Sequence, residues 1–196
     1  MRCGKPLEKA EQEYCRDCSR QDTVYEQGRS VWVHREPVSR AIYKFKYENK
    51  RNYGRIFAGE MAEHCGAQIR RWGIEEIIPV PLHPARKRKR GYNQAEILAE
   101  ELGGLLNIPV SKDVLYRIRN TRPQKSLNDT ERIRNLKGAF AVAKNQKLKE
   151  KVLLVDDIYT TGNTIRRTAK MLRLAGAQKV YFLTISMDKD SEYMLY

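Results

Sequence analysis

The sequence predicts an α/β protein in which a parallel β-sheet is flanked by helices. Two observations lead to this fold class. Short aliphatic runs of strand length alternate along the chain with segments of helical periodicity, which is typical of β-α-β units. One of these runs, residues 151–156, passes through a polar turn directly into a helical pattern, as strands do in doubly wound sheets.

The first half of the chain supplies two predicted strands and three predicted helices. Residues 30–34 (SVWVH) alternate like a strand, and residues 75–82 contain a short buried strand that stops at two prolines. Asn93 is a suitable N-cap for the third helix. Helical spacing of apolar residues extends over 37–47, 54–70 and 93–106.

The second half supplies four more predicted strands and one helix. Residues 114–119 and 138–143 read as strands. The polar, basic segment between them is long for a loop in a compact domain, and we expect it to be functional or mobile. The strand at 151–156 leads into a helix at 163–175, and residues 179–186 form the last strand.

Composition constrains the location and the partners of the chain. With 196 residues and 41% hydrophobic content, the chain is sufficient for a folded domain with a core. It has no run of about 18 apolar residues and its N-terminus is polar, so we expect a cytoplasmic protein without membrane insertion. The excess of 38 Lys and Arg over 24 Asp and Glu gives a net charge of +14, which favours polyanionic partners such as nucleic acid or phosphorylated small molecules.

The basic residues are concentrated in three segments. One is RKRKR at residues 86–90, and a second spans residues 117–137, where Lys and Arg far outnumber Asp and Glu. The third, residues 40–55, interleaves lysines and arginines with aromatic residues. A solvated surface that keeps the protein soluble explains any one segment, but three together favour anion binding.

Three of the four cysteines lie near the N-terminus. In a cytosolic chain, the C-x-x-C spacing of Cys15 and Cys18 is more typical of a zinc knuckle than of a disulfide, and Cys3 adds a third thiolate. We therefore expect residues 1–25 to form a small zinc-knuckle segment. The candidates for the fourth zinc ligand are a cysteine one position before Met1, a water, His34, His64 and Cys65. The alternative is three ordinary thiols in a frayed terminus.

The stretch VLLVDDIYTTGNT, residues 152–164, has the chemistry of a sugar phosphate site. A turn that enters a helix N-terminus presents backbone N–H groups to an anion, Gly162 lets the chain turn tightly, and the threonines add hydroxyl donors. Asp156 and Asp157 precede this turn and are suited to accept hydrogen bonds from sugar hydroxyls or to hold Mg²⁺ through water. The combination predicts a ribose 5-phosphate site.

Other interpretations of this stretch fit less well. The chain contains neither a G-x-x-x-x-G-K-[ST] loop nor a G-x-G-x-x-G fingerprint, which excludes the common nucleotide-binding motifs. An acidic turn that only caps a helix would explain the threonines. It would not explain two aspartates at the end of a buried strand, where an unpaired charge is costly.

Residues 152–164 resemble the phosphoribosyl pyrophosphate (PRPP) signature of type I phosphoribosyltransferases. Residues 79–95 (PVPLHPARKRKRGYNQA) and 121–140 (TRPQKSLNDTERIRNLKGAF), together with the N-terminal cysteines, resemble the ComF family of competence proteins, in which a zinc knuckle precedes a phosphoribosyltransferase-like domain. The resemblance covers nearly the whole chain and implies that residues 26–196 form a type I phosphoribosyltransferase-like domain. The chain departs from the family pattern at the missing first cysteine of the knuckle.

The resemblance implies a role for each motif. Asp156 and Asp157 would hold the ribose hydroxyls of PRPP in the catalytic centre, with Mg²⁺ on the pyrophosphate oxygens. Arg86 and Arg90 resemble the region that faces pyrophosphate, and Arg132 belongs to a loop that closes over the reaction centre as a further catalytic residue. The residues implied to hold the 5-phosphate are Thr160, Thr161, Gly162, Asn163 and Thr164.

Two functions from different classes remain open. The ComF family is associated with transport of single-stranded DNA in natural transformation beside a helicase-like motor, so the first is a DNA-uptake factor. The predicted DNA contacts are Lys44, Lys46, Arg51 and Arg132. The second is an active phosphoribosyltransferase with an unidentified acceptor. Thr160 stands where relatives that act on 6-oxopurines carry a candidate aspartate base, so that substrate is not indicated.

Overall fold

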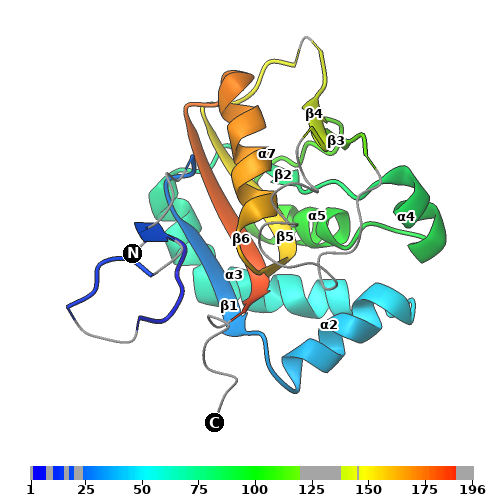
Figure 1. The fold of residues 1–196 in the computed structure, drawn as a ribbon. Helices are drawn as coiled ribbons and strands as arrows, with labels where there is room; N and C mark the ends of the chain where they lie inside the picture. Colours follow the sequence, from blue (N-terminus) through cyan, green and yellow to red (C-terminus); the bar gives the residue numbers. More distant parts are fainter. Residues whose placement is uncertain are drawn as a thin grey trace.

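The computed structural model describes residues 2–7, 11–15, 18–19, 24–119, 138–144 and 146–188. Within this part of the chain the main sheet has the strand order β1-β6-β5-β2, and every neighbouring pair is parallel (Figure 1). The four strands are β1 (Gly28–Val33), β2 (Glu76–Pro79), β5 (Lys151–Tyr159) and β6 (Lys179–Met187). The predicted parallel α/β sheet is confirmed.

The central strands are apolar on both faces because helices cover both sides of the sheet. Along β5, Val152 and Leu154 belong to one hydrophobic cluster, whereas Leu153 and Val155 belong to the other. This alternation follows from the two-residue period of a strand. It means that the next two residues of β5 also point to opposite faces of the sheet.

Helices form a layer on each face (Figure 1). On one side, α3 (Tyr53–Trp72) and α5 (Gln94–Leu106) pack against each other and against the sheet. α2 (Val38–Tyr47) packs against α3 on the same side. On the other side, α7 (Asn163–Leu174) buries Ile165, Ala169 and Leu172. These helices agree with the sequence prediction to within a few residues at their ends.

Two strands of the described chain lie outside the main sheet. β3 (Leu115–Arg117) and β4 (Phe140–Val142) pair antiparallel with each other in a separate two-stranded sheet. Both were predicted as strands, but the alternation of strands and helices alone does not reveal which strands share a sheet. The pair contacts α7 through β4 (Figure 1).

The basic run after β2 forms a short helix that was not predicted from the sequence, α4 (Pro84–Arg90). Its N-cap is His83, whose Nδ1 accepts a hydrogen bond from the Ala85 backbone N–H at 3.2 Å. It ends at Gly91, which has a φ of 84°. None of its residues is buried, so it lacks the apolar periodicity that reveals a helix in a sequence.

β5 is also longer than predicted. It was expected to end at Asp156, but its pairing with β6 continues to Tyr159 opposite Met187. Asp157 therefore lies inside the strand rather than after it. No described helix is long and apolar enough to cross a membrane.

Candidate functional site

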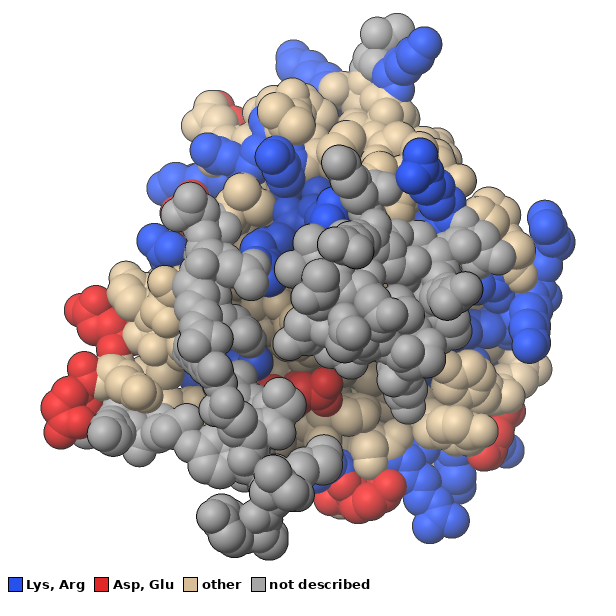
Figure 2. Space-filling model, in the orientation of Figure 1, with Lys and Arg blue, Asp and Glu red and all other residues tan. Residues whose placement is uncertain are grey.

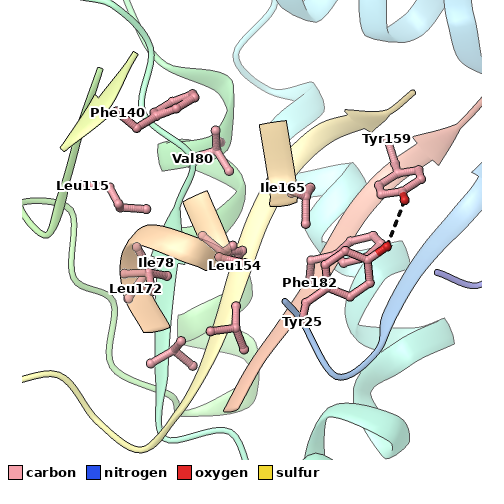
Figure 3. Close-up of a cluster of buried hydrophobic side chains, with 14 of the residues drawn as sticks. Tyr25, Ile78, Val80, Leu115, Phe140, Leu154, Tyr159, Ile165, Leu172 and Phe182 are labelled. Carbon is pink, nitrogen blue, oxygen red and sulfur yellow. Dashed lines mark hydrogen bonds between the residues drawn. The ribbon is translucent and has the colours of Figure 1, made fainter. Parts of the chain in front are cut away.

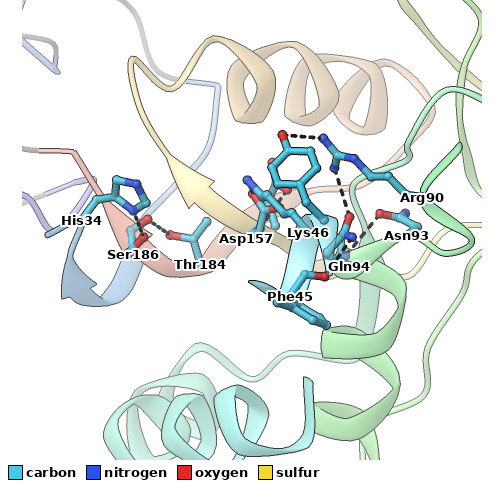
Figure 4. Close-up of polar contacts among 12 residues, drawn as sticks. His34, Phe45, Lys46, Arg90, Asn93, Gln94, Asp157, Thr184 and Ser186 are labelled. Atoms are coloured by element: carbon cyan, nitrogen blue, oxygen red, sulfur yellow. Dashed lines mark hydrogen bonds and ion pairs between the residues drawn. The ribbon is translucent and has the colours of Figure 1, made fainter. Parts of the chain in front are cut away.

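The predicted ribose site is centred on Asp156 and Asp157 at the carboxyl end of β5. Because neighbouring residues of a strand point to opposite faces, the two carboxylates have different surroundings. Asp157 forms an ion pair with Lys46 of α2, with 2.9 Å between Oδ1 and Nζ, and the two side chains are only 14% and 15% exposed (Figure 4). Asp156 accepts a hydrogen bond from the Asp157 backbone N–H at 2.8 Å.

The surroundings of Asp156 change its pKa. Burial, reinforced by the neighbouring charge of Asp157, raises the pKa of Asp156 to about 7, although Lys46 and Arg117 act in the opposite direction. A carboxyl group with such a pKa is sensitive to the arrival of a cation, since a cation favours its ionised form. Perturbed pairs of this kind are common at functional sites.

The predicted phosphate turn connects β5 to α7. Gly162 has a φ of 73° and is the N-cap of α7, whose first turn contains no acidic residue. Asn163 Nδ2 donates a hydrogen bond to Thr161 Oγ1 at 2.9 Å, and the Arg166 guanidinium donates one to the Thr161 carbonyl at 2.8 Å. These bonds fix the turn from within. The backbone N–H groups at the helix N-terminus and the charge of Arg166 both favour an anion here.

Three arginines lie near the carboxylates. Arg86 and Arg90 of α4 and Arg117 of β3 line the same cavity as the two aspartates. Burial and the nearby charge of Arg86 lower the pKa of Arg117 to about 10, which still leaves it charged at neutral pH. Burial followed by the charge of Arg90 also lowers the pKa of Arg86. A polyanion that bound here would neutralise the mutual repulsion of these guanidinium groups.

Aspartates, turn and arginines enclose one cavity of about 200 Å³. Of the residues predicted for PRPP, the cavity is lined by Asp156, Asp157, Thr160, Gly162, Thr164, Arg86 and Arg90. Thr161 and Asn163 are not among the lining residues but bond to each other within the turn. Arg132 lies outside the residues that the structure describes. The residues predicted to hold the two ends of PRPP thus line one cavity.

Two cations of this site were not predicted from the sequence. Arg117 was counted only as part of a basic segment, although a charged residue two positions after the buried Leu115 points inward on a strand, and this alternation was a usable signal. Lys46 was assigned to a separate DNA surface. Its position beside Asp157 depends on how α2 packs against the sheet, and no local pattern reveals that.

The surface predicted to bind DNA therefore borders the cavity. Lys46 and Tyr47 line the cavity, and the Arg90 guanidinium lies 4.9 Å from the centre of the Tyr47 ring and donates a hydrogen bond to its hydroxyl. Tyr43 and Tyr47 are 53% and 51% exposed, with ring centres 4.9 Å apart. On the face shown in Figure 2, Lys and Arg side chains are widely spread and Asp and Glu are fewer.

Arg51 follows α2 in the chain, and its contacts differ from those of Lys46 and Tyr47. Its guanidinium is 4.8 Å from the centre of the Tyr92 ring, and its Nε donates a hydrogen bond to Asn49 Oδ1 at 3.2 Å. Lys44 is half-buried in the last turn of α2. Both residues add positive charge to the segment that carries the exposed tyrosines.

The three N-terminal cysteines form a cluster. The sulfur atoms of Cys3, Cys15 and Cys18 all lie within 4.8 Å of one another, and all three residues are buried. Hydrogen bonds from Cys15 and then Cys3 lower the pKa of the Cys18 thiol to about 2, and contacts with Cys15 and Cys18 raise the pKa of Cys3. The thiol set is suited to a thiophilic cation such as Zn²⁺.

None of the predicted protein candidates for a fourth ligand joins this cluster. Among the described residues, the group that could hold a metal consists of the three cysteines alone. His34 Nδ1 is 2.9 Å from Ser186 Oγ (Figure 4), and His64 lies 3.4 Å from Glu60 on α3. Cys65 is buried in the hydrophobic cluster on the other face of the sheet from the three cysteines.

The chain is similar to one protein-family model and to several known proteins. A model of the family described as "Phosphoribosyl transferase domain" matches residues 88–195. The chain is 34% identical over 183 residues to Competence protein F of Haemophilus influenzae, covering 91% of this chain and 80% of that protein. It is 29% identical to Competence protein ComFC of Streptococcus pneumoniae (85% and 71% covered) and 28% identical to DNA utilization protein YhgH of Salmonella typhi (85% and 74% covered).

Proposed function

Since this chain belongs to the ComF family of competence proteins and contains a phosphoribosyl transferase domain, we propose that the cavity at the end of β5 binds PRPP together with Mg²⁺. The observation that carries this proposal is the meeting of three groups of residues in one cavity. These are the carboxylates of β5, the turn at the N-terminus of α7, and the arginines of α4 and β3.

Each group matches one part of the ligand. Asp156 and Asp157 suit the ribose hydroxyls, because ionised carboxylates accept hydrogen bonds from a diol. The turn around Gly162 suits the 5-phosphate through its N–H groups and helix dipole. Arg86 and Arg117 suit the pyrophosphate, because guanidinium groups bind phosphate oxygens in pairs.

The residues present also fit Mg²⁺. This ion binds one or two carboxylates and completes its shell with waters and substrate phosphates, and the adjacent aspartates provide such oxygen ligands. When bound, Mg²⁺ would supply positive charge to the pyrophosphate oxygens. Lys46 already balances one of the carboxylates, so it would hold Asp157 in place until the ligand arrives.

We infer further that the protein handles single-stranded DNA in natural transformation. Two relatives are named as competence proteins and a third as a DNA utilization protein. The exposed Tyr43–Tyr47 pair offers stacking faces, and Lys44 and Arg51 add cations in and just after the same helix. Stacking on aromatic rings and phosphate contacts are the usual basis of sequence-tolerant binding to single strands. Because Lys46 and Tyr47 belong to both surfaces, DNA and PRPP would influence each other's binding.

A second function, phosphoribosyl transfer to an acceptor, is favoured by the arginines that face the carboxylates. Such an arrangement would stabilise the charge that develops on departing pyrophosphate. Pyrophosphate release from PRPP, measured with candidate nucleobases and with DNA, tests this activity. Release that depends on one acceptor and on Asp157 would support transfer, and no release with any acceptor would leave binding as the role of the cavity.

Calorimetry with PRPP and Mg²⁺ tests the proposed binding. The wild type should bind, and Asp157→Asn should bind about ten-fold or more weakly because a charged acceptor is removed. Glu150→Gln is a matched control, since Glu150 is exposed just before the opposite end of the same strand. Equal affinity for the wild type and Asp157→Asn would remove the assignment.

A further inference from the structure

We propose that two buried tyrosines, Tyr25 and Tyr159, connect the cysteine cluster to the phosphate turn, so that both act as positioning residues for the 5-phosphate and metal loading of the cluster sets the geometry of the turn. The proposal rests on the proposed function, because it concerns the same phosphate-binding turn. No sequence motif links the cysteines with this site.

The connection is a continuous line of polar atoms through the hydrophobic core. Cys18 Sγ lies 3.9 Å from the Tyr25 hydroxyl, which lies 3.1 Å from the Tyr159 hydroxyl (Figure 3). Tyr25 is 4% exposed and Tyr159 is 2% exposed. Buried hydroxyl groups are costly unless they are paired, so each of these hydroxyls depends on the other and on the sulfur.

Phe182 of β6 holds both rings in place. The Tyr159 ring stacks on Phe182 with centres 4.8 Å apart and planes 4° apart, and the Tyr25 ring meets the same side chain edge-on at 5.0 Å (Figure 3). Aromatic contacts of this kind restrict ring orientation. A shift of Tyr25 would therefore be passed to Tyr159 through the shared hydroxyl contact and through Phe182.

At the other end, Tyr159 supports the turn directly. A Cβ atom placed on Gly162 would come within 2.3 Å of the Tyr159 hydroxyl, so the backbone of the turn lies against this oxygen with no side chain between them. Gly162 is also the N-cap of α7, with a φ of 73°. The position of the Tyr159 hydroxyl thus limits where the phosphate-binding N–H groups can lie.

The cysteine cluster has the dimensions of a metal site. In a tetrahedral zinc site with Zn–S bonds of about 2.3 Å, neighbouring sulfurs are about 3.8 Å apart. Cys3 and Cys15 Sγ lie 3.4 Å apart, and all three sulfurs lie within 4.8 Å of one another. The buried thiols therefore fit Zn²⁺ with little rearrangement.

Metal binding would give the line of hydrogen bonds one direction. A metal-bound thiolate only accepts hydrogen bonds, so Tyr25 would donate to Cys18 and Tyr159 would donate to Tyr25. Without metal, hydrogen bonds among the three sulfur atoms hold the cluster together, and these bonds fix the position of the Cys18 sulfur less firmly than bonds to a metal would. Hydrogen bonds to ligand atoms commonly orient metal sites, and here the same bonds would orient the turn.

Hydrogen exchange of the ligand-free protein tests the connection without relying on PRPP. Tyr25→Phe and Tyr159→Phe each remove one hydroxyl and keep the ring. Both should speed amide exchange in residues 160–164, and the double variant should be no faster than the faster single variant. Chelating the metal should speed exchange in the wild type but add little in Tyr25→Phe. Tyr181→Phe is the matched control, because Tyr181 is 8% exposed and stacks on Trp72 in the other core.

Binding of ribose 5-phosphate, measured on the same proteins, gives a second readout. Tyr25→Phe should weaken it roughly five-fold, which is the size of one net hydrogen bond, and Tyr181→Phe should leave it unchanged. Unchanged exchange in Tyr25→Phe, or an equal response of Tyr25→Phe and wild type to chelation, would overturn the proposal. If the wild type binds neither PRPP nor ribose 5-phosphate, the proposed function fails, while the exchange measurements still decide whether the tyrosines connect the two sites.

Discussion

At the scale of single residues, the site depends on two adjacent aspartates that strand geometry separates. Asp157 faces α2 and is balanced by Lys46, whereas Asp156 has its pKa raised by burial and by Asp157. Asp157 is thus held in an ion pair, whereas the raised pKa of Asp156 lies near neutral pH. This difference gives the site a measurable dependence on pH.

The pH dependence of stability should reveal Asp156. Its pKa is about 7 in the folded protein and about 3.9 in an unfolded chain. The folded state therefore holds the proton more tightly, and the free energy of unfolding should fall as pH rises from about 4 to about 7. Relative to the wild type, Asp156→Asn should be more stable at pH 8 than it is at pH 4 in denaturant titrations. A constant difference across this range would show that Asp156 has an ordinary pKa.

Arg117 should distinguish PRPP from ribose 5-phosphate. It faces the cavity from β3, and we assign it to the pyrophosphate, which ribose 5-phosphate lacks. Arg117→Gln should weaken PRPP binding about ten-fold or more, the cost of removing a charged hydrogen bond, and change ribose 5-phosphate binding little. Arg173→Gln, at the last turn of α7, is the control in calorimetry. Equal losses of affinity for both ligands would place Arg117 at the 5-phosphate instead.

At the scale of elements, α2 contributes both to the cavity and to the exposed surface. Lys46 and Tyr47 line the cavity, and the exposed Tyr43 lies against Tyr47. α4 supplies Arg86 and Arg90 from an exposed helix with no buried residue. Both helices place cations at the carboxyl edge of the sheet, where parallel α/β folds bind ligands.

DNA binding should follow the exposed side of α2. The double variant Lys44→Ala, Arg51→Ala should weaken binding of single-stranded DNA of any sequence and flatten its salt dependence by roughly one unit for each phosphate that is no longer neutralised. Fluorescence anisotropy of a labelled oligonucleotide at several salt concentrations measures both effects. The control is Lys170→Ala, Lys179→Ala, which removes two exposed lysines from α7 and the amino end of β6. Equally weakened binding in both double variants would mean that binding follows net charge rather than α2.

Some of these elements and contacts could be predicted from the sequence, and others could not. β5, its turn and α7 were predicted because their signals are local: an aliphatic run, a glycine turn and a helical period. α4 was missed because an all-polar helix has no apolar period. The contacts of Lys46 and Tyr25 were missed because they join segments far apart in the chain, and one sequence contains no signal for such pairs.

At the scale of the whole molecule, both faces of the sheet take part in the site. The face covered by α2, α3 and α5 supplies Lys46, and the face covered by α7 contains the cysteine cluster and Tyr159. The cysteines belong to the same hydrophobic cluster as Phe182 and Ile165. Metal at the cluster should therefore affect the stability of the entire α7 side.

Zinc should stabilise the protein but bind less tightly than at a site with four cysteines, because three thiolates are present in the cluster. Metal analysis and competition with a chromogenic chelator measure occupancy and affinity, and thermal melts should shift upward with zinc. Cys15→Ser should lose both effects, whereas Cys65→Ser should keep zinc binding because Cys65 lies outside the cluster. Loss of zinc in Cys65→Ser would show that Cys65 completes the site.

We propose that one cavity at the end of β5 holds PRPP between carboxylates, turn and arginines. Backbone amide NMR of the 22.9 kDa protein during titration with PRPP and Mg²⁺ can locate this binding. The largest chemical-shift changes are expected at residues 156–164, with smaller ones at 86–90 and 117, and these changes should be lost in Asp157→Asn. Chemical-shift changes confined to other parts of the protein, or the same changes in Asp157→Asn, would show that PRPP does not bind in this way.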